Sequence, residues 1–154
     1  MAESSSHAEP ATATATGPRP LSVLLYSDDF TTRDAVRAGV GRRPTRDLEV
    51  TSWHECATPP AVIEAVANER FDLLILDGEA VPAGGLGLSR QLKNEIYDCP
   101  PILVLTGRPQ DVWLAAWSLA DAAVPQPLDP IALCAGIEQA LASAPAPGPE
   151  PAAL

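Results

Sequence analysis

The sequence predicts an α/β fold: a doubly wound sheet of five parallel strands with helices on both faces. Five apolar runs alternate with five segments of helical periodicity, the pattern of repeated βαβ units. Several of these runs are continuously apolar, as burial on both faces of a parallel sheet requires. The chain of 154 residues is 46% hydrophobic and 19% charged, which is enough apolar material for one packed core.

The first half is predicted to contain two strands and two helices. The strands are "LSVLLYS" (21–27) and "LEVTSW" (48–53), both of ordinary strand length. The helices are "TTRDAVRAGVG" (31–41) and "PPAVIEAVANE" (59–69), in which apolar residues return at helical spacing. Thr58 is the predicted N-cap of the second helix, because a proline opens the segment that follows it.

The second half continues the alternation with three strands and three helices. In chain order they are "FDLLIL" (71–76), "GLSRQLKNE" (87–95), "PILVLT" (101–106), "DVWLAAWSLA" (111–120), "AAV" (122–124) and "DPIALCAGIEQALA" (129–142). Asp129 is in position to cap the last helix, and Pro130 takes its first position.

Two segments outside this pattern are predicted to be flexible. Residues 1–20 and the Pro- and Ala-rich residues 143–154 have no periodicity and cannot bury enough surface to offset the entropy of ordering. Residues 21–142 are therefore expected to form a stand-alone domain with no effector domain after it.

Composition excludes several classes of function. The net charge of −10, from 20 acidic and 10 basic residues, argues against direct nucleic-acid binding, which depends on Lys and Arg. No signal peptide and no run near ~20 apolar residues is present, so a cytoplasmic protein without membrane insertion is expected. Three widely spaced cysteines indicate neither disulfides nor zinc. Nine of the ten basic residues are Arg, which with much Ala and Pro is typical of a GC-rich bacterial genome.

Polar residues at the carboxyl ends of the central strands indicate where chemistry is located. Asp28 and Asp29 follow the first strand, Asp77 the third, and Thr106 ends the fourth. Carboxylates brought together repel one another unless a hard cation neutralises them, and an all-oxygen site suits Mg²⁺. The hypothesis is a metal-assisted acidic pocket in which Asp77 is a nucleophile toward phosphoryl groups and the Thr106 hydroxyl bonds the product.

Four stretches together resemble the landmarks of the receiver domains of bacterial two-component response regulators: "VLLYSDDF", "LLILD", "ILVLT" and a final "QP". The resemblance covers residues 21–142 and implies a flavodoxin-like fold. It implies that Asp28 and Asp29 bind magnesium, that Asp77 accepts the phosphoryl group, and that Thr106 reports phosphorylation. A histidine kinase or a small phosphodonor would then be the source of phosphate.

The chain departs from the receiver pattern at the same site. Gln126 stands where receivers carry a Lys, and a neutral amide cannot neutralise phosphoryl charge. Ala123 stands at the expected aromatic switch position of the last strand, and Glu79 adds a negative charge. The chain is thus similar to single-domain, degenerate receiver-like proteins of GC-rich bacteria. That resemblance implies one candidate partner, the cytoplasmic arm of a respiratory NADH dehydrogenase.

Each site residue also has a purely structural interpretation. Asp77 before Gly78 is a typical turn dipeptide, and Asp28 and Asp29 suit the start of a helix. Thr106 is then an ordinary hydroxyl at the end of a strand.

The helix predicted at 111–120 carries Trp113 and Trp117 four residues apart, on one side. Val112, Ala116 and Leu119 are expected to form its inward stripe, with Trp113 covering the core and Trp117 toward solvent. The alternative is that both indoles fold over the core. Trp side chains are enriched at interface hot spots, and receivers commonly bind partners through their fourth and fifth helices, here 111–120 and 129–142.

The function expected is therefore a non-enzymatic module that docks to another protein. The alternative is a working regulator phosphorylated on Asp77. A nucleotide or flavin domain is not expected, because no strand is followed by a GxGxxG or P-loop motif.

Overall fold

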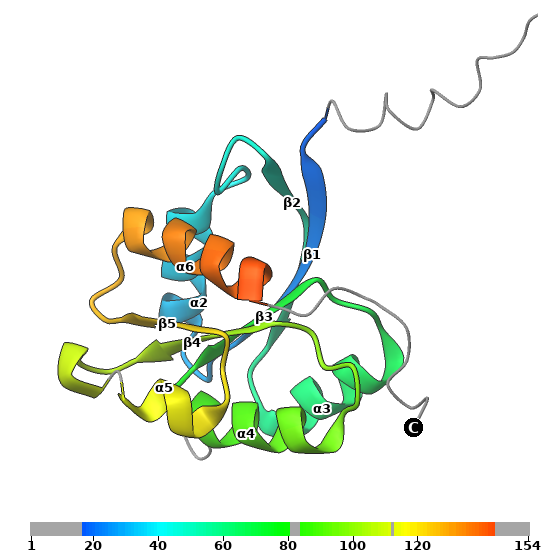
Figure 1. The fold of residues 1–154 in the computed structure, drawn as a ribbon, viewed down its shortest axis with the longest axis vertical. Helices are drawn as coiled ribbons and strands as arrows, with labels where there is room; N and C mark the ends of the chain where they lie inside the picture. The colour runs from blue at the N-terminus through cyan, green and yellow to red at the C-terminus, as the bar shows by residue number, and fades with distance from the viewer. Residues whose placement is uncertain (1–16, 81–83, 112, 144–154) are drawn as a thin grey trace, which may run out of the picture.

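A computed structural model of the chain describes residues 17–80, 84–111 and 113–143, which form a three-layer α/β/α domain (Figure 1). The flexible tails predicted at 1–20 and 143–154 lie outside these ranges, except for residues 17–20 and Ser143. The first strand already begins at Arg19, and the last helix ends at Ser143.

All strand pairs in the described sheet are parallel, and the strand order is β2-β1-β3-β4-β5. The strands are β1 Arg19–Tyr26, β2 Leu48–Cys56, β3 Leu73–Asp77, β4 Ile102–Thr106 and β5 Ala122–Pro125. The chain runs from β1 outward to β2, then returns to the other side of β1 to build β3, β4 and β5. The predicted doubly wound fold is confirmed.

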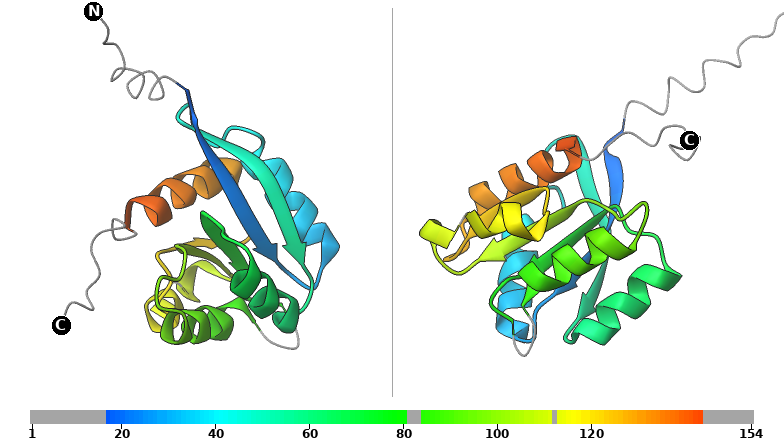
Figure 2. Two further views of the ribbon diagram at one scale, coloured as in Figure 1. Left: turned by 90° about the vertical axis from the view of Figure 1, so that its right-hand side faces the viewer. Right: turned by 60° about the horizontal axis from the view of Figure 1, so that its bottom comes forward.

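The helices cover both faces of this sheet (Figure 2). They are α2 Phe30–Val40, α3 Pro59–Asn68, α4 Gly85–Glu95, α5 Trp113–Ser118 and α6 Pro130–Ser143. Residues of α2 and α6 share one core cluster, while residues of α3, α4 and α5 pack in the other. Each face of the sheet is therefore closed by its own set of helices.

Strand β3 shows why the central apolar runs are continuous. Leu73 and Ile75 belong to the core under α2 and α6, whereas Leu74 and Leu76 belong to the core under α3, α4 and α5. All five residues of β3 are buried, and so are all five of β4. Because successive side chains point to opposite faces, a strand covered on both sides needs apolar residues at every position.

Both predicted helix caps are confirmed. The Thr58 hydroxyl accepts a hydrogen bond from the Ala61 amide at 3.2 Å, at the start of α3. The Asp129 carboxylate accepts one from the Ala132 amide at 2.9 Å, at the start of α6. Each cap satisfies an amide that would otherwise have no partner in the first helical turn.

The helix predicted at 111–120 is shorter than expected. A 3₁₀ turn covers Pro109–Asp111, and α5 ends at Ser118 because Leu119 takes the left-handed conformation with φ of 64°. Of the expected inward stripe, Val112 lies outside the described residues, and the assignments of Ala116 and Leu119 are wrong because both are exposed. Ala115 packs against the core instead, and Ser118 is buried.

Candidate functional site

A pocket of about 410 Å³ lies beyond the carboxyl ends of β1, β3, β4 and β5. It is lined by Asp28, Asp29, Thr32, Asp77, Glu79, Gly107 and Gln126. Residues predicted from the ends of three separate strands therefore meet at one place, as the crossover topology of a parallel sheet brings about.

Asp77 is the last residue of β3 and is only 3% exposed. Its Oδ1 accepts a hydrogen bond from the Glu79 amide at 2.8 Å, the contact of an aspartate that forms a turn. Its Oδ2 accepts one from the Ser27 hydroxyl at 2.8 Å. A side chain at Gly78 would place its Cβ 2.5 Å from the Leu105 carbonyl oxygen, so the chain leaves β3 through a glycine. Asp77 is thus both a turn former and a carboxylate of the pocket.

Asp28 and Asp29 are exposed at the rim of the pocket, between β1 and α2. Asp29 is the N-cap of α2: its Oδ1 accepts hydrogen bonds from the Thr31 hydroxyl at 2.7 Å and the Thr31 amide at 2.9 Å. The hydroxyl contact is the main cause that lowers the pKa of Asp29. The structural interpretation of Asp29 as a helix start is confirmed, and it coexists with a place in the pocket.

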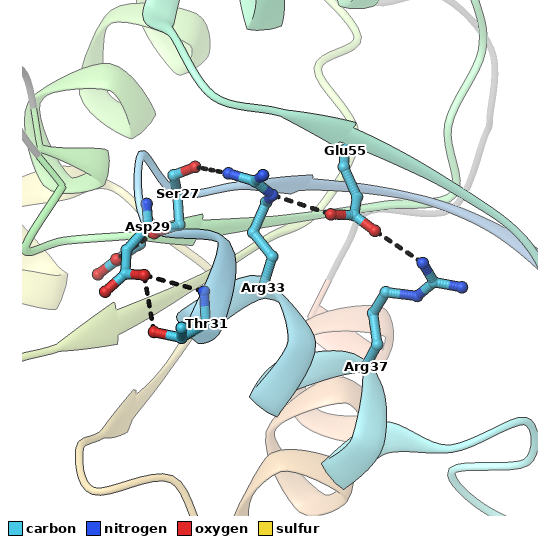
Figure 3. A network of polar contacts seen from close by, with 7 residues as sticks. Ser27, Asp29, Thr31, Arg33, Arg37 and Glu55 are labelled. Atoms are coloured by element: carbon cyan, nitrogen blue, oxygen red, sulfur yellow. Dashed lines mark hydrogen bonds and ion pairs between the residues drawn. The ribbon is translucent and has the colours of Figure 1, made fainter.

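Two arginines of α2 form a network with Ser27 and Glu55 (Figure 3). Arg33 donates to the Ser27 carbonyl oxygen at 2.6 Å and to Glu55 Oε1 at 2.8 Å. Arg37 donates to Glu55 Oε2 at 2.7 Å, and this contact together with the one from Arg33 lowers the pKa of Glu55 against the opposing effect of burial. The cations of α2 are therefore engaged with β2 and the end of β1, and neither lines the pocket.

Gln126 lines the pocket directly after β5. Its backbone N–H donates to the Thr106 carbonyl oxygen at 2.8 Å. Thr106 is not among the lining residues. Its side-chain oxygen is the one buried side-chain nitrogen or oxygen without a hydrogen-bond partner in the described part of the chain. The predicted Gln126 position is thus at the pocket, while the Thr106 hydroxyl is buried and is not part of the pocket lining.

Glu79 extends the negative charge across the pocket. Its carboxyl carbon would lie 2.6 Å from a Cβ at Gly107, so the side chain reaches from the end of β3 to the end of β4. Below the pocket, burial and then the carboxylates of Asp28 and Asp77 raise the pKa of Tyr26. Among the described lining residues four are carboxylates and none is Lys or Arg, so the pocket is strongly negative.

The donor atoms suit Mg²⁺ in kind, since the lining offers only oxygen and one amide. Their arrangement does not fit a preformed metal centre. In residues 17–80, 84–111 and 113–143, no three His, Cys, Asp or Glu side chains are grouped closely enough to hold an ion. Both Asp77 oxygens and one Asp29 oxygen already accept protein hydrogen bonds. Magnesium binding by Asp28, Asp29 and Asp77 stays a prediction.

Sequence reasoning missed Ser27, Thr32 and Gly107 as residues of this site or of its support. The strand predicted at 21–27 ends at Tyr26 in the structure, and the Ser27 side chain donates to Asp77. The available signal was a small polar residue at the end of an apolar run, directly before the acidic pair.

The tryptophans of α5 lie on the surface. Trp113 is 66% exposed and Trp117 is 47% exposed. The expected exposure of Trp117 is confirmed, whereas the expectation that Trp113 covers the core is wrong, as is the alternative with both indoles buried. The Arg90 guanidinium of α4 lies 5.2 Å from the centre of the Trp117 ring and donates to the Trp117 carbonyl oxygen at 2.6 Å. This contact orients Trp117 without burying it.

Relatives identify the family. Over 113 residues the chain is 54% identical to uncharacterized response regulatory proteins from two strains of Mycobacterium tuberculosis. The match covers 73% of this chain and 85% of each relative. The chain belongs to the response regulator family. The resemblance of the four sequence landmarks to receiver domains is thereby confirmed.

Solved structures agree with this response regulator in fold. The chain superimposes on the chemotaxis response regulator CheY4 of Vibrio cholerae with a TM-score of 0.63 and 20% sequence identity. The match covers 80% of this chain and 99% of that one. The receiver domain of NtrX from Brucella abortus matches with a TM-score of 0.64 and 18% sequence identity. That match covers 78% of this chain and 98% of the other. No family model matches the sequence. None of the helices in the described part of the chain has the length and apolar character needed to cross a membrane.

Proposed function

We propose that this response regulator acts as a docking module that binds another protein through α5, and that its acidic pocket is degenerate as a phosphoacceptor site. The exposure of Trp113 and Trp117 on one short helix carries the proposal. Trp is on average a highly buried residue, and it is enriched among the anchors that dominate protein interfaces. The α5 surface corresponds to the fourth helix through which receivers commonly bind partners.

The pocket supports the degenerate part of the proposal. A phosphoryl group at Asp77 would add negative charge beside Asp28, Asp29 and Glu79, and Gln126 can offer only a neutral hydrogen bond. Ala123 on β5 has no ring whose position could change with phosphorylation. Charge repulsion therefore disfavours the modification, and a conventional readout is missing.

A second candidate is a working phosphorylation switch, favoured by the partnerless buried hydroxyl of Thr106. In that function an Asp77 oxygen attacks the phosphorus of a phosphodonor, the bond from phosphorus to the leaving group breaks, and the leaving group departs with the electron pair. Asp28, Asp29 and Asp77 would hold Mg²⁺, which offsets charge when bound. A histidine kinase or a small phosphodonor would supply the phosphoryl group.

The proposal is tested by affinity capture with paired variants, with the captured proteins identified by mass spectrometry. The cytoplasmic arm of a respiratory NADH dehydrogenase is the first candidate to look for, and a histidine kinase the second. Trp117→Ala is expected to keep stability within about 1 kcal/mol, because the ring is exposed. It is expected to lower partner affinity by about 2 kcal/mol or more, the scale of a hot spot.

Asp77→Asn is expected to retain the same partner. Phe30→Ala is the matched control, since it removes an exposed aromatic ring from α2 on the opposite face of the sheet. Loss of the partner in Asp77→Asn, with retention in Trp117→Ala, would support the phosphorylation switch instead.

A further inference from the structure

The Ser27 side chain is fully buried between the end of β1 and the carboxylate of Asp77. Its oxygen accepts a hydrogen bond from the Asp29 amide at 3.1 Å and donates to Asp77 Oδ2 at 2.8 Å. A hydroxyl has a single proton, so the incoming amide fixes the direction in which that proton points. The proton of the Ser27 hydroxyl therefore points to Asp77 Oδ2.

The backbone of Ser27 is held as firmly as its side chain. Arg33 donates to the Ser27 carbonyl oxygen at 2.6 Å and is itself paired with Glu55 at 2.8 Å (Figure 3). Ser27 therefore cannot easily turn away from Asp77. The other oxygen of that carboxylate accepts from the Glu79 amide at 2.8 Å, so both oxygens are engaged inside the protein.

We infer that Ser27 is a positioning residue that keeps Asp77 unreactive toward phosphodonors by holding its Oδ2 in a buried hydrogen bond. The inference rests on the proposed degenerate pocket and gives it a cause that is separate from Gln126. To form the acyl phosphate, an Asp77 oxygen must attack phosphorus while the donor's leaving group, acetate for acetyl phosphate, departs with the electron pair. Attack by Oδ2 requires this oxygen to give up the hydrogen bond from the Ser27 hydroxyl, and that bond stabilises the unreacted carboxylate.

The test is the initial rate at which acetyl phosphate with Mg²⁺ adds a phosphoryl group to the full chain, followed by intact mass. Ser27→Ala is expected to raise this rate about tenfold, equivalent to about 1.4 kcal/mol of barrier. Ser89→Ala is the matched control, because it also removes a fully buried hydroxyl, one that donates to the Ser118 carbonyl oxygen far along the chain. Its rate is expected to equal that of wild type, and Asp77→Asn gives the background.

A second pair of variants separates the hydroxyl from packing. Ser27→Thr and Ser27→Val add similar volume and differ in the hydroxyl alone, so the valine variant is expected to react faster than the threonine variant. A Ser27→Ala rate no higher than wild type, or an equal rise in Ser89→Ala, would overturn the inference while leaving the docking proposal intact. Fast, complete labelling of wild type would overturn the degenerate pocket and the inference together, because Asp77 would then react with the Ser27 hydrogen bond in place.

Discussion

Burial sets the chemistry of the three cysteine thiols, residue by residue. Burial raises the pKa of Cys56 and of Cys99 to about 11, and it also raises the pKa of Cys134. The thiolate is the reactive form, so at pH 8 only roughly one molecule in a thousand carries it at a site with a pKa near 11. These thiols are structural side chains rather than nucleophiles.

Slow alkylation of the folded protein is therefore expected. At pH 8, iodoacetamide should modify Cys56 and Cys99 at least about tenfold more slowly than in urea-unfolded chain, as read by peptide mass spectrometry. The rates in the folded state should climb as the pH rises toward 11. Equal rates in folded and unfolded protein at pH 8 would show that burial does not protect these residues.

At the scale of an element, the start of α2 belongs both to the helix and to the acidic pocket. Asp29 caps the helix through Thr31 and also lines the acidic pocket. The pKa of Asp29 is lowered because the hydrogen bonds from Thr31, with a smaller contribution from Arg33, outweigh the opposing effect of burial. The cap is thus the stronger reason for a carboxylate at this position.

Asp29→Ala is expected to lower the melting temperature by about 2 to 5 °C at pH 7, because the first turn of α2 loses its cap. Asp29→Asn should keep most of that stability, since Asn is also a good N-cap. A lowered pKa stabilises the fold above the ordinary value of 3.8 and ceases to do so as the pH falls below it. The difference between wild type and Asp29→Asn in calorimetry should therefore shrink below pH 3.8. A constant difference down to pH 2 would exclude a contribution from the charge.

For the whole molecule, which has a net charge of −10, the fold brings four of the 20 acidic residues together at one end of the sheet. The described pocket brings four carboxylates together without a lining cation. Such crowding costs free energy in the folded state and favours any cation that binds there.

Saturating Mg²⁺ is expected to stabilise the protein by about 1 to 3 kcal/mol through mass action, more than NaCl at equal ionic strength. Asp28→Asn should reduce the difference between the two salts, because it removes one carboxylate from the pocket and leaves the Asp29 cap in place. Thermal melts with and without a chelator measure the effect. Identical responses to both salts would show screening alone and would remove Mg²⁺ from the site.

The sequence by itself determined the features that depend on neighbours along the chain. Alternating apolar runs indicated the strands, the caps at Thr58 and Asp129 indicated helix starts, and polar residues after strands indicated the pocket. These are local signals, because the periodicity of side chains and the chemistry of a first helical turn are set within a few residues. They placed Asp28, Asp29 and Asp77 at one end of the sheet, and the resemblance to receivers added Gln126.

Only the tertiary structure decided how those residues are held. Ser27 and Asp77 are 50 residues apart in sequence, and Arg33 and Glu55 are 22 apart, so no local pattern could pair them. The same holds for α5, which ends before a left-handed Leu119 and on which Trp113 is exposed. Exposure and pairing are properties of packed surfaces, and a one-dimensional pattern does not specify which distant side chain fills the space beside a given residue.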